Sequence, residues 1–164
     1  MKRHFCILLI LLFIISLCSC KQSKDSIQTP VSFYYCNSTV EYNAETAVIS
    51  AEVRDSSDYV QDLKGLLNLY FQGPVSHAHQ SPFPPGVQVS SLDEADGVIH
   101  IVLNAPFASL KGLDLTVACA CLSKTVIGFT GCKSVEISVK DLTIVGSASI
   151  TMDTQSLLLI DDSF

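Results

Sequence analysis

The sequence predicts a single small α+β domain in which two helices pack on one face of a mixed β-sheet. A chain of 164 residues allows one domain with an ordinary core. Short segments rich in β-branched and aromatic residues alternate with segments whose apolar residues recur at helical spacing. In chain order these segments give β-β-α-β-β-α-β, and this order defines the predicted architecture.

The first predicted unit is a pair of strands followed by a helix. Residues 31–36 and 47–53 are rich in β-forming residues and predict the strands. Small polar residues at 56–58 are typical of a helix N-terminus. The apolar residues that follow share one helix face: Tyr59, Leu63, Leu66, Leu67 and Tyr70. Gly73 and Pro74 predict the end of this helix.

A β-hairpin is predicted next, after a polar, Pro-rich loop at residues 75–85. Its strands are expected at residues 87–92 and 98–103. Asp96 and Gly97 between them form a turn signal that favours a tight hairpin connection.

The second helix is expected at residues 113–129, followed by an alternating strand at 134–139. The predicted buried stripe of the helix consists of Leu115, Ala118, Leu122, Val126 and Phe129. Beyond the strand the pattern weakens, and residues 157–160 either form one short extra strand or belong to a loose tail.

The N-terminus predicts export. Residues 5–17 are an apolar run shorter than the roughly 20 residues that span a bilayer as a helix. The run ends in a string that resembles the lipobox of bacterial lipoproteins, namely Leu17, Cys18, Ser19 and Cys20. The resemblance implies a signal peptide at 1–19 and a diacylglyceryl and acyl lipid, such as palmitate, on Cys20. Residues 20–30 are then a lipidated tether. A plain secretory signal and an uncleaved anchor are the alternatives.

The charge distribution argues against a nucleic-acid partner. The chain carries 10 basic and 16 acidic residues, and Lys2 and Arg3 lie in the predicted signal peptide. Removal of residues 1–19 therefore leaves 8 basic and 16 acidic groups, a net charge of −8. Nucleic-acid binding needs basic patches that neutralise phosphate.

Few residues suggest metal or catalytic chemistry. His77 and His79 are the best candidate metal ligands, because alternate side chains of a strand point the same way. No cysteine or carboxylate near them has ligand spacing, so a solvated loop without metal is the favoured interpretation. The acidic residues Asp93, Glu94 and Asp96 favour a solvated hairpin tip over a catalytic pair. No nucleophile motif such as G-x-S-x-G occurs, and we expect no enzymatic activity and no cofactor beyond the lipid.

Four cysteines follow the lipobox: Cys36, Cys119, Cys121 and Cys132. In an exported protein four cysteines permit three pairings. Free core thiols are the favoured interpretation, because a core of this size needs no disulfide, and a disulfide is the alternative.

The order of these segments resembles the GerMN domain of bacterial sporulation and spore-germination lipoproteins. The resemblance covers residues 31–159 and includes the Leu-rich helix that closes in residues 66–74, the Pro85-Gly86 loop, the hairpin and the second helix. We accordingly place a GerMN-like domain at 31–145 and a C-terminal extension, with at most one short strand, at 146–164.

The resemblance implies a non-enzymatic domain whose fold is similar to ring-building modules that pack side by side. The chain is then expected on the extracytoplasmic face of the cell membrane, held by its lipid, as an assembly or scaffold component. Expected partners are envelope or sporulation proteins, or further copies of the chain. The predicted contact surface is an exposed strand edge together with Gln72, Gly73, Pro74 and Val75.

The alternative hypothesis is a ligand-binding lipoprotein. Residues 75–86, with Phe83 and the two histidines, would then capture a small molecule or a cell-wall fragment.

Overall fold

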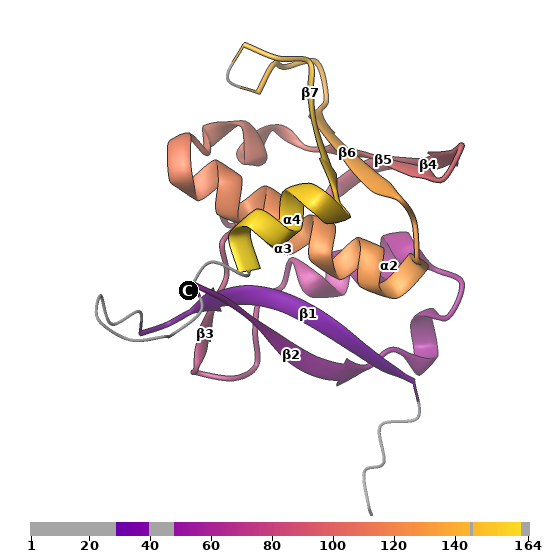
Figure 1. Cartoon of the computed structure of the whole chain (residues 1–164), viewed down its shortest axis with the longest axis vertical. Helices are drawn as coiled ribbons and strands as arrows, with labels where there is room; N and C mark the ends of the chain where they lie inside the picture. Colours follow the sequence, from indigo (N-terminus) through magenta and orange to yellow (C-terminus); the bar gives the residue numbers. More distant parts are fainter. Residues whose placement is uncertain (1–28, 40–47, 145, 162–164) are drawn as a thin grey trace, which may run out of the picture.

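The computed structural model describes residues 29–39, 48–144 and 146–161, with side chains up to Leu157 (Figure 1). The strands form a three-stranded sheet in the order β2-β1-β3 and a four-stranded sheet in the order β4-β5-β6-β7. The first sheet consists of β1 (Pro30–Asn37), β2 (Ile49–Asp55) and β3 (His79–Gln80). The second consists of β4 (Val89–Ala95), β5 (Val98–Leu103), β6 (Ser134–Val139) and β7 (Ser149–Asp153). The α-helices are α2 (Leu63–Tyr70), α3 (Gly112–Thr130) and α4 (Thr154–Asp161), and the short 3-10 helices are η1 (Ser57–Tyr59) and η2 (Ala105–Ser109).

Helix α3 is the centre of the fold. It contacts β1 on one side and β6 and β7 on the other, so that it runs between the two sheets (Figure 1). Ten of its residues are buried, including Val117, Cys119 and Cys121, which lie outside the predicted stripe. Residues 115–123 carry no charged side chain, so the helix can be covered on several sides. Phe129, at the C-terminal end of the predicted stripe, is only partly buried.

The α+β class is confirmed, but the strands are divided between two sheets instead of forming one. The physical reason is that α3 presents apolar surface on opposite sides. A single sheet could cover only one of these sides. The β1/β2 pair therefore forms a separate layer across the helix from the hairpin and β6.

Side chains complete the edge of β1 where none of the described strands pairs with it. Strand β3 pairs only with the end of β1, at Cys36 and Asn37. Further back along β1, the amide of Tyr34 donates to Thr125 Oγ1 of α3 at 3.0 Å. The hydroxyl of Tyr70 donates to the Tyr34 carbonyl. Both backbone groups of Tyr34 are thus satisfied, as burial requires.

Helix α2 begins later than predicted. The small polar segment at 56–58 contributes to the 3-10 helix η1, and α2 begins after Asp62, whose carboxylate accepts the amide of Gly65 at 2.8 Å. Asp62 is the better cap because its side chain can reach this free amide of the first turn. The predicted end is confirmed, and Gly73 adopts a φ of +96° that favours glycine.

The hairpin and the following strand are confirmed. Asp96 and Gly97 both have positive φ, and the ladder closes at Ala95 and Val98. The first hairpin strand is shifted towards this turn, because the ladder extends to the turn itself. Strand β6 then pairs parallel with β5, and α3 supplies the crossover.

The C-terminal segment differs from the expectation for residues 157–160. The strand there is β7, which pairs antiparallel with β6, and residues 157–160 belong to α4. Asp153 Oδ1 accepts both the amide and the hydroxyl of Ser156 at 2.7 Å. This capping interaction starts a helix directly after β7, so the apolar run continues as helix.

Candidate interaction site

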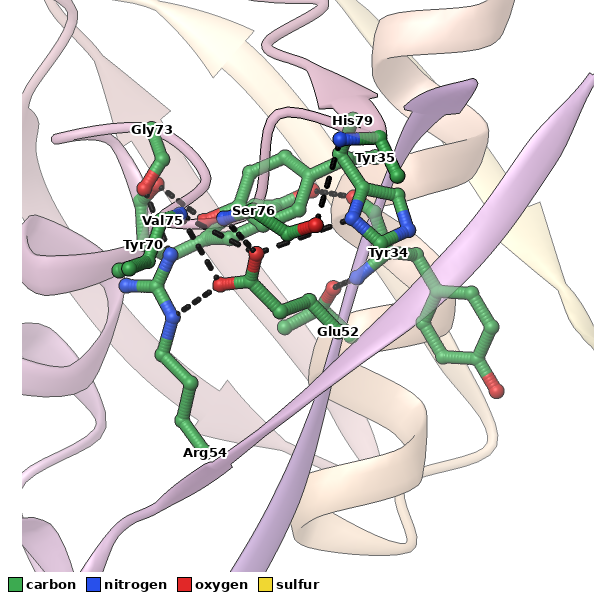
Figure 2. Close-up of polar contacts among 11 residues, drawn as sticks. Tyr34, Tyr35, Glu52, Arg54, Tyr70, Gly73, Val75, Ser76 and His79 are labelled. Atoms are coloured by element: carbon green, nitrogen blue, oxygen red, sulfur yellow. Dashed lines mark hydrogen bonds and ion pairs between the residues drawn. The ribbon is translucent and has the colours of Figure 1, made fainter. Parts of the chain in front are cut away.

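An ion pair on β2 holds the loop that follows α2 (Figure 2). Glu52 and Arg54 lie two residues apart on β2, so both side chains point to the same face, where Arg54 Nε donates to Glu52 Oε1 at 2.5 Å. Arg54 Nη2 donates to the carbonyl of Gly73 at 2.7 Å. The Glu52 carboxylate accepts the amides of Val75, at 3.1 Å, and Ser76, at 2.8 Å. We call these five residues the Glu52–Arg54 clamp.

The clamp is built over aromatic side chains. The guanidinium carbon of Arg54 lies 5.1 Å from the ring centre of Phe33 and 5.9 Å from that of Tyr35. The side chains of Arg54 and Glu52 are only 15% and 10% exposed. Charges so far from water need partners, and here each charge has both the opposite charge and backbone groups.

The electrostatics of Glu52 favour its ionised form. Burial alone would raise the pKa of this carboxyl. The amide hydrogen bonds from Ser76 and Val75, together with Arg54, outweigh burial and lower the pKa below its usual value. Because its oxygens are already occupied by these donors, Glu52 acts as a structural acceptor and is poorly suited to proton transfer.

Two tyrosines connect the clamp face to the helices. Tyr35 lies above Tyr70, with ring centres 4.9 Å apart, and its hydroxyl donates to the Tyr70 carbonyl at 2.9 Å. Burial raises the pKa of both hydroxyls, so both tyrosines remain protonated donors. The polar network thus extends from β2 to α2 and, through Tyr34, to α3.

The predicted contact residues lie in and beside the clamp. Gln72 is exposed, while Gly73 and Pro74 are partly buried. Val75 is 78% exposed although its amide is held by Glu52. The structure therefore places the loop in a defined backbone conformation. Whether this surface binds a partner stays a prediction.

The two histidines differ in environment. His77 is exposed, as expected for a solvated loop. His79 is not solvated: it lies in β3, which pairs with β1, and its Nδ1 is 3.7 Å from Glu52 Oε2. The sequence missed this because a strand of two residues leaves no pattern. Among the described residues, no group of three His, Cys, Asp or Glu side chains is arranged to hold a metal ion.

A second feature is a cavity of about 450 Å³ beside α3. Phe83, predicted to line a ligand site, contributes to its wall together with Cys36. Its rim includes Val48 and Leu113, which are 45% and 75% exposed. The cavity is mainly apolar, with Asp114 as the charged residue among its lining.

The other residues that the sequence analysis singled out are not part of the clamp or the cavity, apart from Cys36. The lipobox residues Leu17, Cys18, Ser19 and Cys20 lie outside the described residues. The acidic residues of the hairpin tip are exposed, as expected: Asp93, Glu94 and Asp96. Cys36, Cys119, Cys121 and Cys132 are free thiols, and all but Cys36 are buried.

The sequence analysis did not identify Glu52 and Arg54. Opposite charges two residues apart on a strand give a usable signal, because their side chains share one face. The partner loop could not be found in this way, since its contribution comes from backbone groups of Gly73, Val75 and Ser76.

Helix α3 is also long and apolar enough to be a candidate membrane span. In the structure ten of its residues are buried, and it contacts strands of both sheets. Core helices commonly meet the same criterion of length and composition, and α3 serves here as the core helix.

Comparisons with known proteins identify the family to which the chain belongs. Residues 32–144, more than half of the chain, match the family model Germane, described as sporulation and spore germination. No curated protein matches the sequence.

Two solved structures are similar in fold. The tandem GerMN domains of the sporulation protein GerM from Bacillus subtilis share 18% identity with a TM-score of 0.53, over 74% of this chain and 44% of that chain. A Clostridium perfringens protein assigned as a lipoprotein shares 16% identity with a TM-score of 0.45, over 80% of this chain and 91% of that chain. The fold likeness to GerM agrees with the family match, and the chain belongs to the Germane family of sporulation and spore-germination domains.

Proposed function

We propose that this chain is a lipid-anchored, extracytoplasmic and non-enzymatic component of an envelope assembly in sporulation or spore germination. Membership of the Germane family supports the connection to sporulation and germination. The lipobox-like string that ends at Cys20 supports the anchor. The observation that carries the assembly role is the Glu52–Arg54 clamp, which fixes a surface loop and leaves the apolar Val75 78% exposed.

A fixed loop is well suited to binding a protein. An exposed apolar residue is ordinary on its own. Val75 differs because a nearly buried ion pair on a neighbouring strand holds its backbone amide. A loop that is ordered before binding loses little conformational entropy on association, so more of the contact energy appears as affinity.

The strand that carries the clamp offers a second contact. Strand β2 is at the edge of its sheet, so none of the other described strands pairs with one side of its backbone. Val53 on this strand is 51% exposed. Edge strands can pair with a strand of another protein, and the proposed surface therefore consists of Val75 and the free edge of β2.

The chemistry of the clamp supports a non-catalytic role. Glu52 and Arg54 form a nearly buried ion pair, and both bind backbone groups of the protein itself. Side chains committed in this way stabilise a conformation and leave no group free to act on a substrate.

The test is affinity purification of the tagged, lipidated protein from its native membrane, with crosslinking and mass spectrometry, before and during sporulation. Val75→Asp is compared with Val60→Asp, a matched control because Val60 is 61% exposed and lies outside the clamp. We expect envelope proteins with the wild type and with Val60→Asp during sporulation, and their loss with Val75→Asp. Recovery of the wild type without partners, or equal recovery with both variants, would contradict the proposal.

A second candidate function is capture of a small molecule or cell-wall fragment, and the cavity of about 450 Å³ beside α3 favours it. A thermal-shift screen with peptidoglycan fragments tests this hypothesis. A ligand for this cavity should raise the unfolding temperature of the wild type and have a smaller effect on Leu113→Asp, which places a charge on the rim. If no fragment shifts the wild type, this candidate loses its support.

A further inference from the structure

Two free thiols meet between β1 and α3. The side chains of Cys36 and Cys121 interact directly, and each shifts the pKa of the other. A neighbouring contact explains why they meet: the amide of Tyr34 binds Thr125 Oγ1 at 3.0 Å. Two residues along a strand span about 6.6 Å, and four residues along a helix span about 6 Å. Cys36 lines a cavity with Asp114 and Val117, which precede Cys121 on α3, so β1 runs from the Tyr34–Thr125 contact towards the turn that carries Cys121.

The two sulfurs differ in access. Cys36 is partly buried and contributes to the wall of the cavity beside α3. Cys121 is 0% exposed. A reagent that enters the cavity can therefore reach Cys36 but not Cys121.

The geometry points to a redox-active dithiol in which Cys36 reacts with a disulfide compound and Cys121 then closes a disulfide that joins β1 to α3. The oxidant is a disulfide by chemical class, either a small molecule such as oxidised glutathione or the disulfide of an oxidoreductase. This inference rests on the contact between the thiols and on the cavity, and it does not depend on the proposed assembly role.

The reaction balances in two exchanges. The Cys36 thiolate attacks one sulfur of the oxidant, forms a mixed disulfide and releases the other half as a thiolate, which takes up a proton. Cys121 then loses its proton and attacks the Cys36 sulfur, and the second half of the oxidant leaves as a thiol. Overall, two protein thiols lose two electrons and two protons, and one disulfide is reduced to two thiols.

The electrostatics agree with this order of attack. The interaction with Cys121 lowers the pKa of Cys36, although burial opposes the shift. The same interaction, together with burial, raises the pKa of Cys121. The thiolate is the attacking form, so the first exchange belongs to Cys36. Burial raises the pKa of Cys119 to about 12, which keeps that thiol unreactive.

The first experiment uses the mature, lipidated protein in detergent, equilibrated in glutathione buffers of increasing oxidised fraction. Remaining thiols are blocked with a maleimide, and peptides are analysed by mass spectrometry. We expect one linked peptide pair, Cys36 with Cys121, while Cys119 and Cys132 carry maleimide. A linkage through Cys119 or Cys132, or four free thiols in fully oxidised glutathione, would overturn the inference.

The disulfide should also stabilise the fold. Positions 36 and 121 are 85 residues apart, and a cross-link that closes so long a loop restricts the unfolded chain. We expect the unfolding midpoint to rise by roughly 10 °C on oxidation. An unchanged or lowered midpoint in protein that carries the Cys36–Cys121 link would contradict the fit of the disulfide to the native structure.

Single variants test the order of attack. Cys121→Ser should accumulate glutathione on Cys36, because the resolving thiol is missing. Cys36→Ser should leave Cys121 unmodified, and Cys119→Ser should still form the disulfide. Cys119 is the matched control because it lies in the same helix and is also 0% exposed. Circular dichroism of Cys36→Ser, the least buried site, separates a redox effect from misfolding. Glutathione on Cys121 in folded Cys36→Ser would reverse the assigned roles.

Discussion

The two sheets pack on the same helix but are stabilised by different kinds of contact. In the four-stranded sheet, the buried positions of β5 and β6 are aliphatic, and its ion pair of His100 with Glu136 is on the partly exposed face. At the three-stranded sheet, polar groups are themselves buried: Tyr35 of β1 and Tyr70 of α2 donate to backbone carbonyls, and Glu52 and Arg54 hold a loop. The comparison teaches that the four-stranded sheet depends on apolar area, and the three-stranded sheet on satisfied polar groups.

The largest loss of stability should follow a substitution in the apolar face of the four-stranded sheet. Ile137 on β6 is 0% exposed, and Ile137→Ala should lower the free energy of unfolding by roughly 2–5 kcal/mol, because a cavity remains. Urea denaturation measures this. Ser138→Ala on the same strand is the control and should change stability by less than about 0.5 kcal/mol. Equal losses in the two variants would show that this sheet is not held by its apolar face.

The second prediction tests the hydrogen bond by which Tyr70 of α2 holds the three-stranded sheet. Tyr70→Phe keeps the ring but removes the donor to the Tyr34 carbonyl, and should lower the free energy of unfolding by roughly 1–3 kcal/mol. The matched control is Tyr59→Phe, a partly buried tyrosine, which should have almost no effect in the same denaturation experiment. The comparison fails if Tyr70→Phe is as stable as the wild type.

The third prediction concerns how the stabilising contribution of Glu52 depends on pH. The pKa of Glu52 is lower in the folded than in the unfolded protein, so its stabilising contribution is fully present above the unfolded value of about 4.5. This contribution is lost as pH falls through the folded pKa. Glu52→Gln should therefore be destabilised by about 1–2 kcal/mol at neutral pH, with a smaller difference from the wild type at low pH. Denaturation across this pH range measures it, and a difference that grows towards low pH would contradict the assignment.

The smallest change in stability should follow loss of the contact between His100 and Glu136 on the four-stranded sheet. His100 and Glu136 are about one third exposed, with Nδ1 and Oε2 2.7 Å apart. His100→Gln should change the free energy of unfolding by less than about 1 kcal/mol, because solvent screens such pairs. Added salt should reduce even this difference. A larger, salt-independent effect would show that polar contacts matter equally in both sheets.

The same contrast explains what the sequence could predict. Alternation in residues 98–103 and 134–139, and the Asp96-Gly97 turn, predicted the hairpin and β6 because period and turn chemistry are local. The separation into two sheets was not predicted, because it depends on which strands pair across α3. Helix α4 was not predicted, because its start depends on the short-range capping contact between Asp153 and Ser156 and not on an apolar period.

The candidate site was predicted only in part. Residues 72–75 were identified because a helix end followed by glycine and proline predicts an exposed turn. The ion pair that holds this turn comes from a strand about 20 residues earlier in the chain. Such long-range contacts through backbone groups leave no pattern in the sequence, which also explains why His79 was assigned to a solvated loop.

The central claim is that the loop held by the Glu52–Arg54 clamp is a protein-binding surface, and in-cell photo-crosslinking tests it most directly. A photoreactive amino acid is placed at Val75 or, as the control, at Val60, which is similarly exposed. We predict a discrete crosslinked envelope protein from position 75 during sporulation, abolished by Glu52→Ala, and none from position 60. No crosslink from position 75, or equal crosslinks from both positions, would contradict the account.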